Sequence, residues 1–147
     1  MRDISLNIPA GSLVAITGPV GSGKSAMAKA LSGLYPLESG QMLLDSIPLE
    51  DIQAAERAAR VGCLGQALHL FSGTLRRNIL LGSVSFNGKG TGTDTVLNSA
   101  ISCAVLEEDL QAFPAGLETE IGELGIRVSG GQRQRIALSR AMAASAP

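Results

Sequence analysis

The sequence predicts an α/β domain whose sheet core carries a helical insertion in its second half. A continuous apolar run, Leu13–Thr17, is typical of a strand covered on both faces, and a glycine-rich loop and a helical pattern at Lys24–Ser32 follow it directly. Alternating polar and apolar residues at Asp3–Ile8 predict a half-buried strand before that run. Helical patterns at Val96–Leu110 and Gln132–Ala146 dominate the later part of the chain.

The remaining elements follow from turn and cap residues. Pro9–Gly11 is a turn that ends the first strand, and Gly33 is suited to cap the first helix at its C-terminus. Asp51 lies near the start of a helical stretch, Asp51–Arg60, where its charge favours the helix dipole. The other expected elements are strands at Gln41–Leu44 and Val61–Leu64, a flexible loop at Ser83–Thr95 and a helix break at Phe113–Gly116.

Composition limits the classes of function. The 147 residues suffice for one domain with an apolar core, because 45% are hydrophobic and 17% are charged. A net charge of −1, without a long block of either sign, argues against nucleic acid as the main partner. The uncharged run Ile4–Gly23 contains Pro9 and several glycines, so we expect neither a membrane span nor a secretory signal. Cys63 and Cys103 lack metal-ligand spacing and are expected to be reduced thiols.

The glycine-rich loop matches the eight-residue phosphate-binding pattern at every fixed position: Gly18-Pro19-Val20-Gly21-Ser22-Gly23-Lys24-Ser25. Glycines let consecutive N–H groups curl around a phosphate, Lys24 can reach the β- and γ-phosphates, and the Ser25 hydroxyl can bind Mg²⁺. The alternative is a plain strand-to-helix turn. The loop alone predicts only nucleoside triphosphate binding, as in a kinase, a GTPase or a DNA-repair ATPase. The expected nucleotide-binding residues here are Gly18, Gly21, Ser22, Gly23, Lys24 and Ser25.

A second constellation narrows the class: Val128-Ser129-Gly130-Gly131-Gln132-Arg133-Gln134-Arg135, followed by strong helix formers. This run resembles the ABC signature, usually written LSGGQ, with Val128 where Leu is usual. A Ser hydroxyl and glycine amides at a helix N-terminus form an anion-binding nest, although Ser-Gly-Gly alone is more often only a helix cap. In the ABC family the nest serves the γ-phosphate of ATP held by a second, facing domain. The resemblance therefore adds Ser129, Gly130, Gly131 and Gln132 to the nucleotide-binding residues.

Two weaker matches lie between these motifs. Gln66, followed by Phe71–Leu75 and Asn78-Ile79, resembles the Q-loop region of exporter-type ABC domains, which implies that Gln66 touches Mg²⁺ or the attacking water. Gly65 stands where these families often have Pro, and a surface glutamine is the alternative. Thr119–Glu123 resembles the short acidic loop by which exporters contact the transmembrane domain, and a solvated acidic turn is the alternative.

The resemblance implies a P-loop NTPase sheet core with an antiparallel β portion at the N-terminus and an inserted helical subdomain. Residues 1–147 would form a single partial nucleotide-binding domain, with the sheet core at about 1–70 and 125–147 and the helical subdomain at about 71–124. It implies ATP and Mg²⁺ as cofactors, and as partners a second such domain in a head-to-tail dimer and a transmembrane domain. The expected location is the cytoplasmic face of a membrane, and the expected process is export driven by ATP hydrolysis.

Complete ABC domains continue beyond Pro147 into an apolar strand that ends in the Walker B aspartate, followed by a catalytic glutamate and a switch histidine. None of these can be placed here, and His69 is interpreted as an ordinary loop residue. Lys24 and Gln66 are the catalytic candidates, and Ser25 and Gln66 are the metal-binding ones. We therefore expect negligible hydrolysis by this chain alone. The alternatives are a non-transport ABC-type ATPase and a nucleotide-binding module without hydrolysis.

Overall fold

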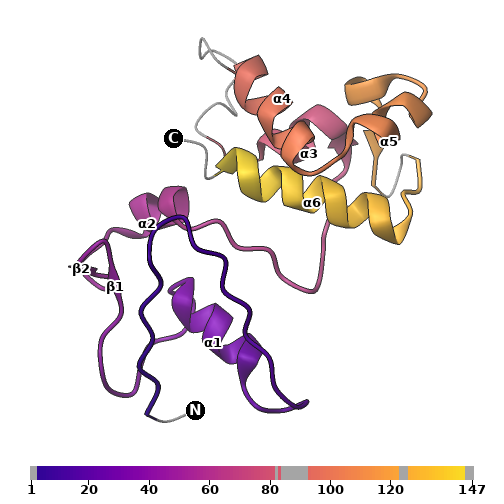
Figure 1. Ribbon diagram of the computed structural model, residues 1–147. Helices are drawn as coiled ribbons and strands as arrows, with labels where there is room; N and C mark the ends of the chain where they lie inside the picture. Colours follow the sequence, from indigo (N-terminus) through magenta and orange to yellow (C-terminus); the bar gives the residue numbers. More distant parts are fainter. Residues whose placement is uncertain (1–2, 82, 84–92, 123–125, 145–147) are drawn as a thin grey trace. The chain divides into compact units, whose positions relative to one another are not determined.

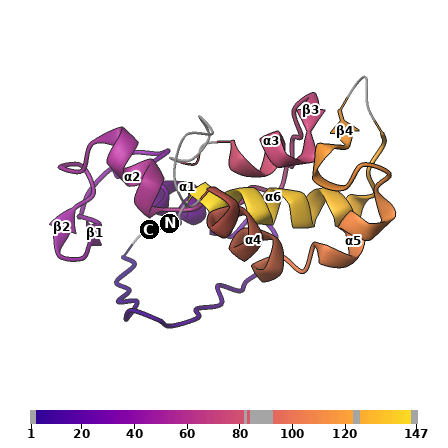
Figure 2. The same cartoon turned by 90° about the horizontal axis from the view of Figure 1, so that it is seen from above.

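A computed structural model describes residues 3–81, 83, 93–122 and 126–144. The chain separates into two compact units, Met1–Gln53 and Ala54–Pro147. Figures 1 and 2 show the elements of each unit from two sides. Each unit has its own small antiparallel pair of strands, β1–β2 in the first and β3–β4 in the second.

The first unit contains α1 (Lys24–Leu31), which directly follows the glycine-rich loop. The predicted cap at Gly33 is confirmed, because this residue has a φ of 71° and closes the helix with two backbone hydrogen bonds. Its N–H donates to Ala30 O at 2.8 Å, and the Leu34 N–H donates to Lys29 O at 2.9 Å. These two bonds form a Schellman motif and satisfy carbonyls that the last helical turn leaves without partners.

A tight hairpin follows in the same unit. β1 (Leu43–Leu44) pairs antiparallel with β2 (Ile47–Pro48), so that Leu44 lies opposite Ile47. The connecting residues Asp45 and Ser46 have φ values of 52° and 69°. Positive φ at both central residues is the type I′ pattern, whose twist matches that of the flanking strands.

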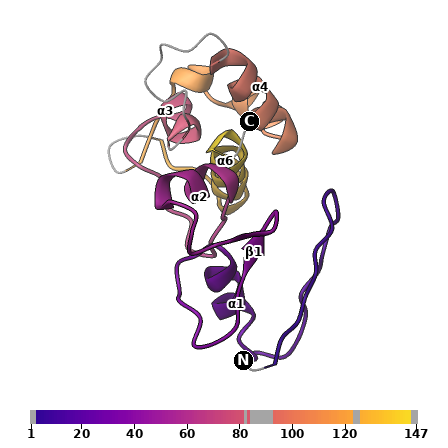
Figure 3. The same cartoon turned by 90° about the vertical axis from the view of Figure 1, so that its left-hand side faces the viewer.

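Three predicted strands do not form in the described part of the chain, and a fourth is shorter than predicted. Asp3–Ile8, Leu13–Thr17 and Val61–Leu64 are coil, and Gln41–Leu44 is a strand only in its last two residues. Figure 3 shows the N-terminal segment as a trace without strand arrows. The prediction failed because an apolar pattern can indicate an extended segment but does not supply the neighbouring backbone that a strand needs. Leu13 is fully exposed as a result.

The second unit is helical. α2 (Ala54–Arg60) comes first, three residues shorter at its N-terminus than predicted. α6 (Gly130–Ala144) runs alongside α3 (Leu75–Leu80) and α4 (Thr93–Cys103), as Figures 1 and 2 show. Apolar side chains from these helices form one core together with residues from α5 (Glu107–Ala112) and its flanks. Its most buried large members are Leu75, Ile79, Leu97, Leu106, Ile121 and Ile136.

The single helix predicted at Val96–Leu110 is two helices, α4 and α5. Val105 adopts a φ of 52°, and the Leu106 N–H donates to Ile101 O at 3.1 Å, which ends α4 in a second Schellman motif. A left-handed valine costs roughly 1–2 kcal/mol. Full burial of Leu106 contributes about 1.5–3 kcal/mol, so burial of this leucine wins over continuation of the helix.

The small sheet of the second unit joins two distant segments. β3 (Gly73–Thr74) pairs antiparallel with β4 (Glu120–Ile121), which follows the 3₁₀ helix η2 (Gly116–Glu118). The segment after Gln66 and the acidic loop are therefore neighbours. The predicted loop at Ser83–Thr95 and the acidic residue Glu123 lie mostly outside the described residues.

Among the described residues, no helix is long and apolar enough to cross a bilayer.

Candidate functional site

The glycine-rich loop of the first unit has the backbone that its glycines predict. Gly18, Gly21 and Gly23 have φ values of 154°, 82° and 92°. Side chains are disfavoured at such angles, and a Cβ on Gly18 would also lie 3.1 Å from Ser22 Oγ. The sequence of left-handed glycines turns the chain sharply into α1, which begins at Lys24.

Lys24 bends back over this loop. Its Nζ donates to Gly18 O and to Pro19 O, each at 2.7 Å, and to Ser22 Oγ at 3.3 Å. The first-turn N–H groups of α1 have no acceptor within the helix, and the Ser25 hydroxyl is exposed beside them. The loop therefore brings together free N–H groups, a cation and a hydroxyl, which is the donor set that a polyphosphate requires.

A magnesium ion at the glycine-rich loop would have few protein ligands and would not be held by a cage of carboxylates. The described residues contain no group of three or more His, Cys, Asp or Glu side chains that could hold a metal. Mg²⁺ on nucleotide usually keeps several waters and takes phosphate oxygens and few protein ligands. The exposed hydroxyl of Ser25 fits that limited role.

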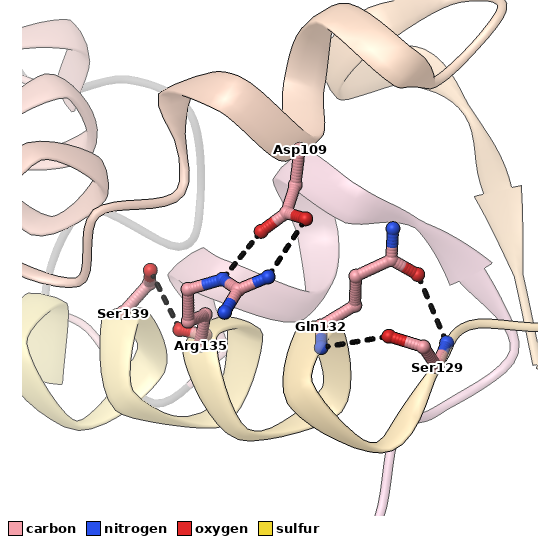
Figure 4. A network of polar contacts seen from close by, with 5 residues as sticks. All are labelled: Asp109, Ser129, Gln132, Arg135 and Ser139. Atoms are coloured by element: carbon pink, nitrogen blue, oxygen red, sulfur yellow. Dashed lines mark hydrogen bonds and ion pairs between the residues drawn. The ribbon is translucent and has the colours of Figure 1, made fainter.

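The Ser-Gly-Gly-Gln run forms the first turn of α6, and we call Ser129–Gln132 the signature turn. The Gln132 N–H donates to Ser129 Oγ at 3.2 Å, and the Ser129 N–H donates to Gln132 Oε1 at 2.9 Å (Figure 4). This reciprocal pair is a capping box, with Ser at the N-cap and Gln three residues later. Gly130 and Gly131 are exposed, and their N–H groups lie in the first turn, where the helix itself offers no acceptor.

Gln66 lies in an exposed bend of the second unit. The segment just after it is fixed by Arg140 of α6, whose guanidinium donates to His69 O at 2.9 Å and to Asn78 O at 2.8 Å. A further bond joins Arg140 Nη2 to Asn78 Oδ1 at 2.9 Å, and the guanidinium lies 5.2 Å from the centre of the Phe71 ring. The side chain of Gln66 is thus exposed to solvent, and the backbone is anchored three residues later, at His69.

The predicted site residues are divided between the two units. Gly18 and the Gly21–Ser25 group belong to the first unit, and Gln66 and the signature turn belong to the second. Within the second unit, Gln66 and the signature turn are apart. Arg140 contacts the segment after Gln66 and lies eleven residues beyond Ser129 on α6, which is roughly 16 Å along the helix axis.

The structure adds residues that the sequence did not single out. Asp109 of α5 accepts from Arg135 Nη2 at 2.8 Å and also from Arg135 Nε, and its side chain is 13% exposed. This hydrogen bonding lowers the pKa of Asp109 and raises that of Arg135. Burial lowers the pKa of Arg140, which faces neutral acceptors. The partners are 26 and 62 residues apart in sequence, so no local pattern could have revealed these pairs.

Comparisons with known proteins identify the family of the chain. The family model described as ABC transporter matches residues 1–147. The chain is 38% identical over 147 residues, all of its length, to the "ATP-dependent lipid A-core flippase" of Sodalis glossinidius (strain morsitans), of which it covers 24%. It is 38% identical over 145 residues, 99% of its length, to the "Probable multidrug resistance ABC transporter ATP-binding/permease protein YheI" of Bacillus subtilis (strain 168), again covering 24% of that protein.

A solved structure gives the same result at the level of the fold. The chain superimposes with a TM-score of 0.71 on the "Structure of a bacterial Atm1-family ABC exporter with ATP bound", at 29% identity, with 86% of this chain and 21% of that chain covered. The chain thus spans about a quarter or less of the proteins that it matches. It belongs to the ABC transporter family and corresponds to the ATP-binding domain of its exporter-type members, a family that binds ATP.

Proposed function

We propose that this chain binds ATP together with Mg²⁺ through its glycine-rich loop. The observation that supports this most directly is the loop itself, in which three left-handed glycines lead into α1 and Lys24 Nζ lies 2.7 Å from two loop carbonyls. On binding, a triphosphate would take the Lys24 cation and the first-turn N–H groups, and the Ser25 hydroxyl would contact the metal ion.

The test compares two lysines on the same helix. Titration with a fluorescent ATP analogue in the presence of Mg²⁺ should give saturable binding to the chain. Lys24→Ala should weaken it at least about tenfold, which corresponds to about 1.4 kcal/mol. Lys29→Ala is the matched control, since Lys29 lies over the Tyr35 ring and outside the loop, and it should bind as the unaltered chain does. Equal binding by both variants would contradict the proposal.

In the complete protein, the proposed role is to drive export across a membrane by ATP hydrolysis. The named relatives support this, because one is a flippase and another an ATP-binding/permease protein. Residues 1–147 would then act as one partial nucleotide-binding domain on the cytoplasmic side, attached to a transmembrane domain. Gln66 would contact Mg²⁺ or the attacking water, and Lys24 would stabilise the charge that develops on the γ-phosphate.

The signature turn would act on a second copy. The exposed glycine N–H groups of Gly130 and Gly131 are suited to a phosphate that arrives from outside the chain. Two such domains, placed head to tail, would form two ATP sites. Each site would hold one ATP between the loop of one copy and the signature turn of the other.

Mixed copies test this arrangement. ATP with Mg²⁺ should promote association of the unaltered chain, as measured by analytical ultracentrifugation, and neither Lys24→Ala nor Ser129→Arg alone should associate. An equal mixture of these two variants should associate again, because the first supplies an intact signature turn and the second an intact loop. Association of Ser129→Arg by itself, equal to that of the unaltered chain, would contradict the head-to-tail site.

A further inference from the structure

The carboxylate of Asp109 is paired with the guanidinium of Arg135 in α6. Both of its oxygens accept from Arg135, through Nε and through Nη2, the latter at 2.8 Å (Figure 4). The side-chain amide of Gln132 makes a further, smaller contribution that lowers the pKa of the same carboxylate. A bidentate pair between a guanidinium and a carboxylate fixes orientation as well as distance. Asp109 therefore ties α5 to the second turn of α6 at a defined geometry.

The partner of Asp109 lies against the signature turn. The guanidinium of Arg135 lies beside Gly131, because its Nη1 and Nη2 are 3.6 and 3.9 Å from the point where a Cβ on that glycine would stand. Gln132 closes the capping box through its Oε1, which accepts from the Ser129 N–H.

The charge of the Arg135 guanidinium also indicates that Asp109 supports the signature turn. An unpaired guanidinium beside Gly131 would be attracted by an arriving phosphate and would swing across the glycine N–H groups. Asp109 neutralises that guanidinium and holds two of its nitrogens, and Glu108 is the other acidic group that contributes to the field at Arg135. The nest then consists of backbone N–H groups in a fixed geometry, with the cation kept to one side.

We propose that Asp109 is a positioning residue for the signature turn, acting through Arg135. The inference rests on the proposed function, since the turn matters only if it receives a phosphate. It concerns a residue on a different helix, 20 positions before Ser129, that does not itself touch the nucleotide.

The first experiment measures amide hydrogen exchange and amide resonances of the signature turn in the absence of nucleotide. In Asp109→Asn, amide hydrogen exchange at Gln132 and Arg133 should accelerate by about fivefold or more, and the ¹⁵N-amide resonances of Gly130 and Gly131 should shift. Asp109→Glu should recover most of the protection, because it restores the carboxylate. Glu118→Gln is the matched control, since it removes an ion pair with Arg76 Nε of 2.7 Å that lies away from the turn. Unchanged exchange and resonances in Asp109→Asn would overturn the proposal.

The second experiment uses the mixed-copy association assay and separates the two claims. Asp109→Asn added to the Lys24→Ala copy, which supplies the signature turn, should raise the ATP concentration for half-maximal association about fivefold or more. The same change on the Ser129→Arg copy, which supplies the loop, should have no such effect. Equal effects on both copies would indicate general destabilisation and would overturn the inference. If exchange changes in Asp109→Asn but no mixture associates with ATP, the head-to-tail function is wrong and the positioning of the turn stands.

Discussion

The two arginines of α6 that contact other elements, Arg135 and Arg140, are held by different chemistry. Arg135 has a carboxylate partner, so its charge is balanced and its pKa is raised. Arg140 donates to carbonyl oxygens and to the amide oxygen of Asn78, and burial lowers its pKa. Asn78 is itself 1% exposed and also bonds both backbone groups of Phe71, at 2.8 and 2.9 Å. Arg140 thus holds the backbone carbonyls of His69 and Asn78, whereas Arg135 holds the carboxylate of Asp109.

The pKa of Asp109 gives a prediction about pH. Its folded-state pKa lies below the unfolded value of about 3.9, because Arg135 stabilises the ionised form. The pair therefore stabilises the fold fully above about pH 5, and the contribution is lost as pH falls through the lowered folded pKa. The difference in unfolding free energy between the unaltered chain and Asp109→Asn should be constant from pH 7 to about pH 5 and should shrink below about pH 4.

Urea denaturation at a series of pH values measures that difference. The control is the same comparison made in an Arg135→Met background, where no guanidinium is present to lower the pKa of Asp109. There the difference should lose its dependence on pH below about pH 4. A difference that grows on acidification in the unaltered background would show that Arg135 does not stabilise the ionised carboxylate.

Among the elements, the β3–β4 pair depends on one glycine. Gly122 has a φ of 106°, and a Cβ there would lie 2.7 Å from Ser72 Cα and 3.0 Å from Ser72 N. Backbone atoms cannot yield as the end of a side chain can, so Gly122→Ala should force the two segments apart. We expect a loss of about 1–3 kcal/mol in unfolding free energy.

The matched control for Gly122→Ala is Gly65→Ala, because a Cβ on Gly65 would meet no atom within 4 Å. That change should stay within about 0.5 kcal/mol of the unaltered chain. Chemical denaturation of both variants checks the prediction. Equal stability of the two would mean that the close approach of Gly122 to Ser72 carries no energetic weight.

The break between α4 and α5 gives a prediction of opposite sign. Val105 is 64% exposed, so its side chain contributes little packing, yet its backbone has a φ of 52°. Val105→Gly removes the clash of the left-handed valine and should stabilise the chain by up to about 1 kcal/mol, the strain less the added freedom of glycine in the unfolded state.

Ser102→Gly is the control for Val105→Gly, since Ser102 lies in the last turn of α4, one residue before its end. Glycine there should destabilise by about 0.5–1 kcal/mol. Thermal unfolding of the two variants should therefore move in opposite directions. A loss of stability in both would show that Val105 is not strained.

For the whole molecule, the prediction concerns linkage between nucleotide and stability. A ligand that binds only the folded chain stabilises it by about 2.7 kcal/mol at a concentration 100 times its Kd. ATP with Mg²⁺ should therefore raise the melting temperature, and Lys24→Ala should abolish the rise. Lys29→Ala, on the same helix, should retain it. A rise that survives Lys24→Ala would place nucleotide somewhere other than the glycine-rich loop.

Local sequence predicted the local structure well. The glycine-rich loop, the cap at Gly33, the break after residue 112 and the last helix all depend on residues close together in the chain, although that helix, predicted from Gln132, begins at Gly130. The predictions of strands at Asp3–Ile8 and Leu13–Thr17 were wrong, because strand pairing depends on segments elsewhere in the chain. The roles of Lys24, Ser25, Gln66 and the signature turn as a nucleotide site stay predictions.

The sequence by itself determined the family and the conformation of the glycine-rich loop, because both depend on residue types at fixed short spacings. Tertiary structure decided the division into α4 and α5, through the burial of Leu106. It also decided the pairing of β3 with β4, where Gly122 approaches Ser72 closely. Only tertiary structure brought Asp109 to Arg135. A side chain that finds its partner on another helix leaves no periodicity in the chain, since the contact depends on how whole helices pack.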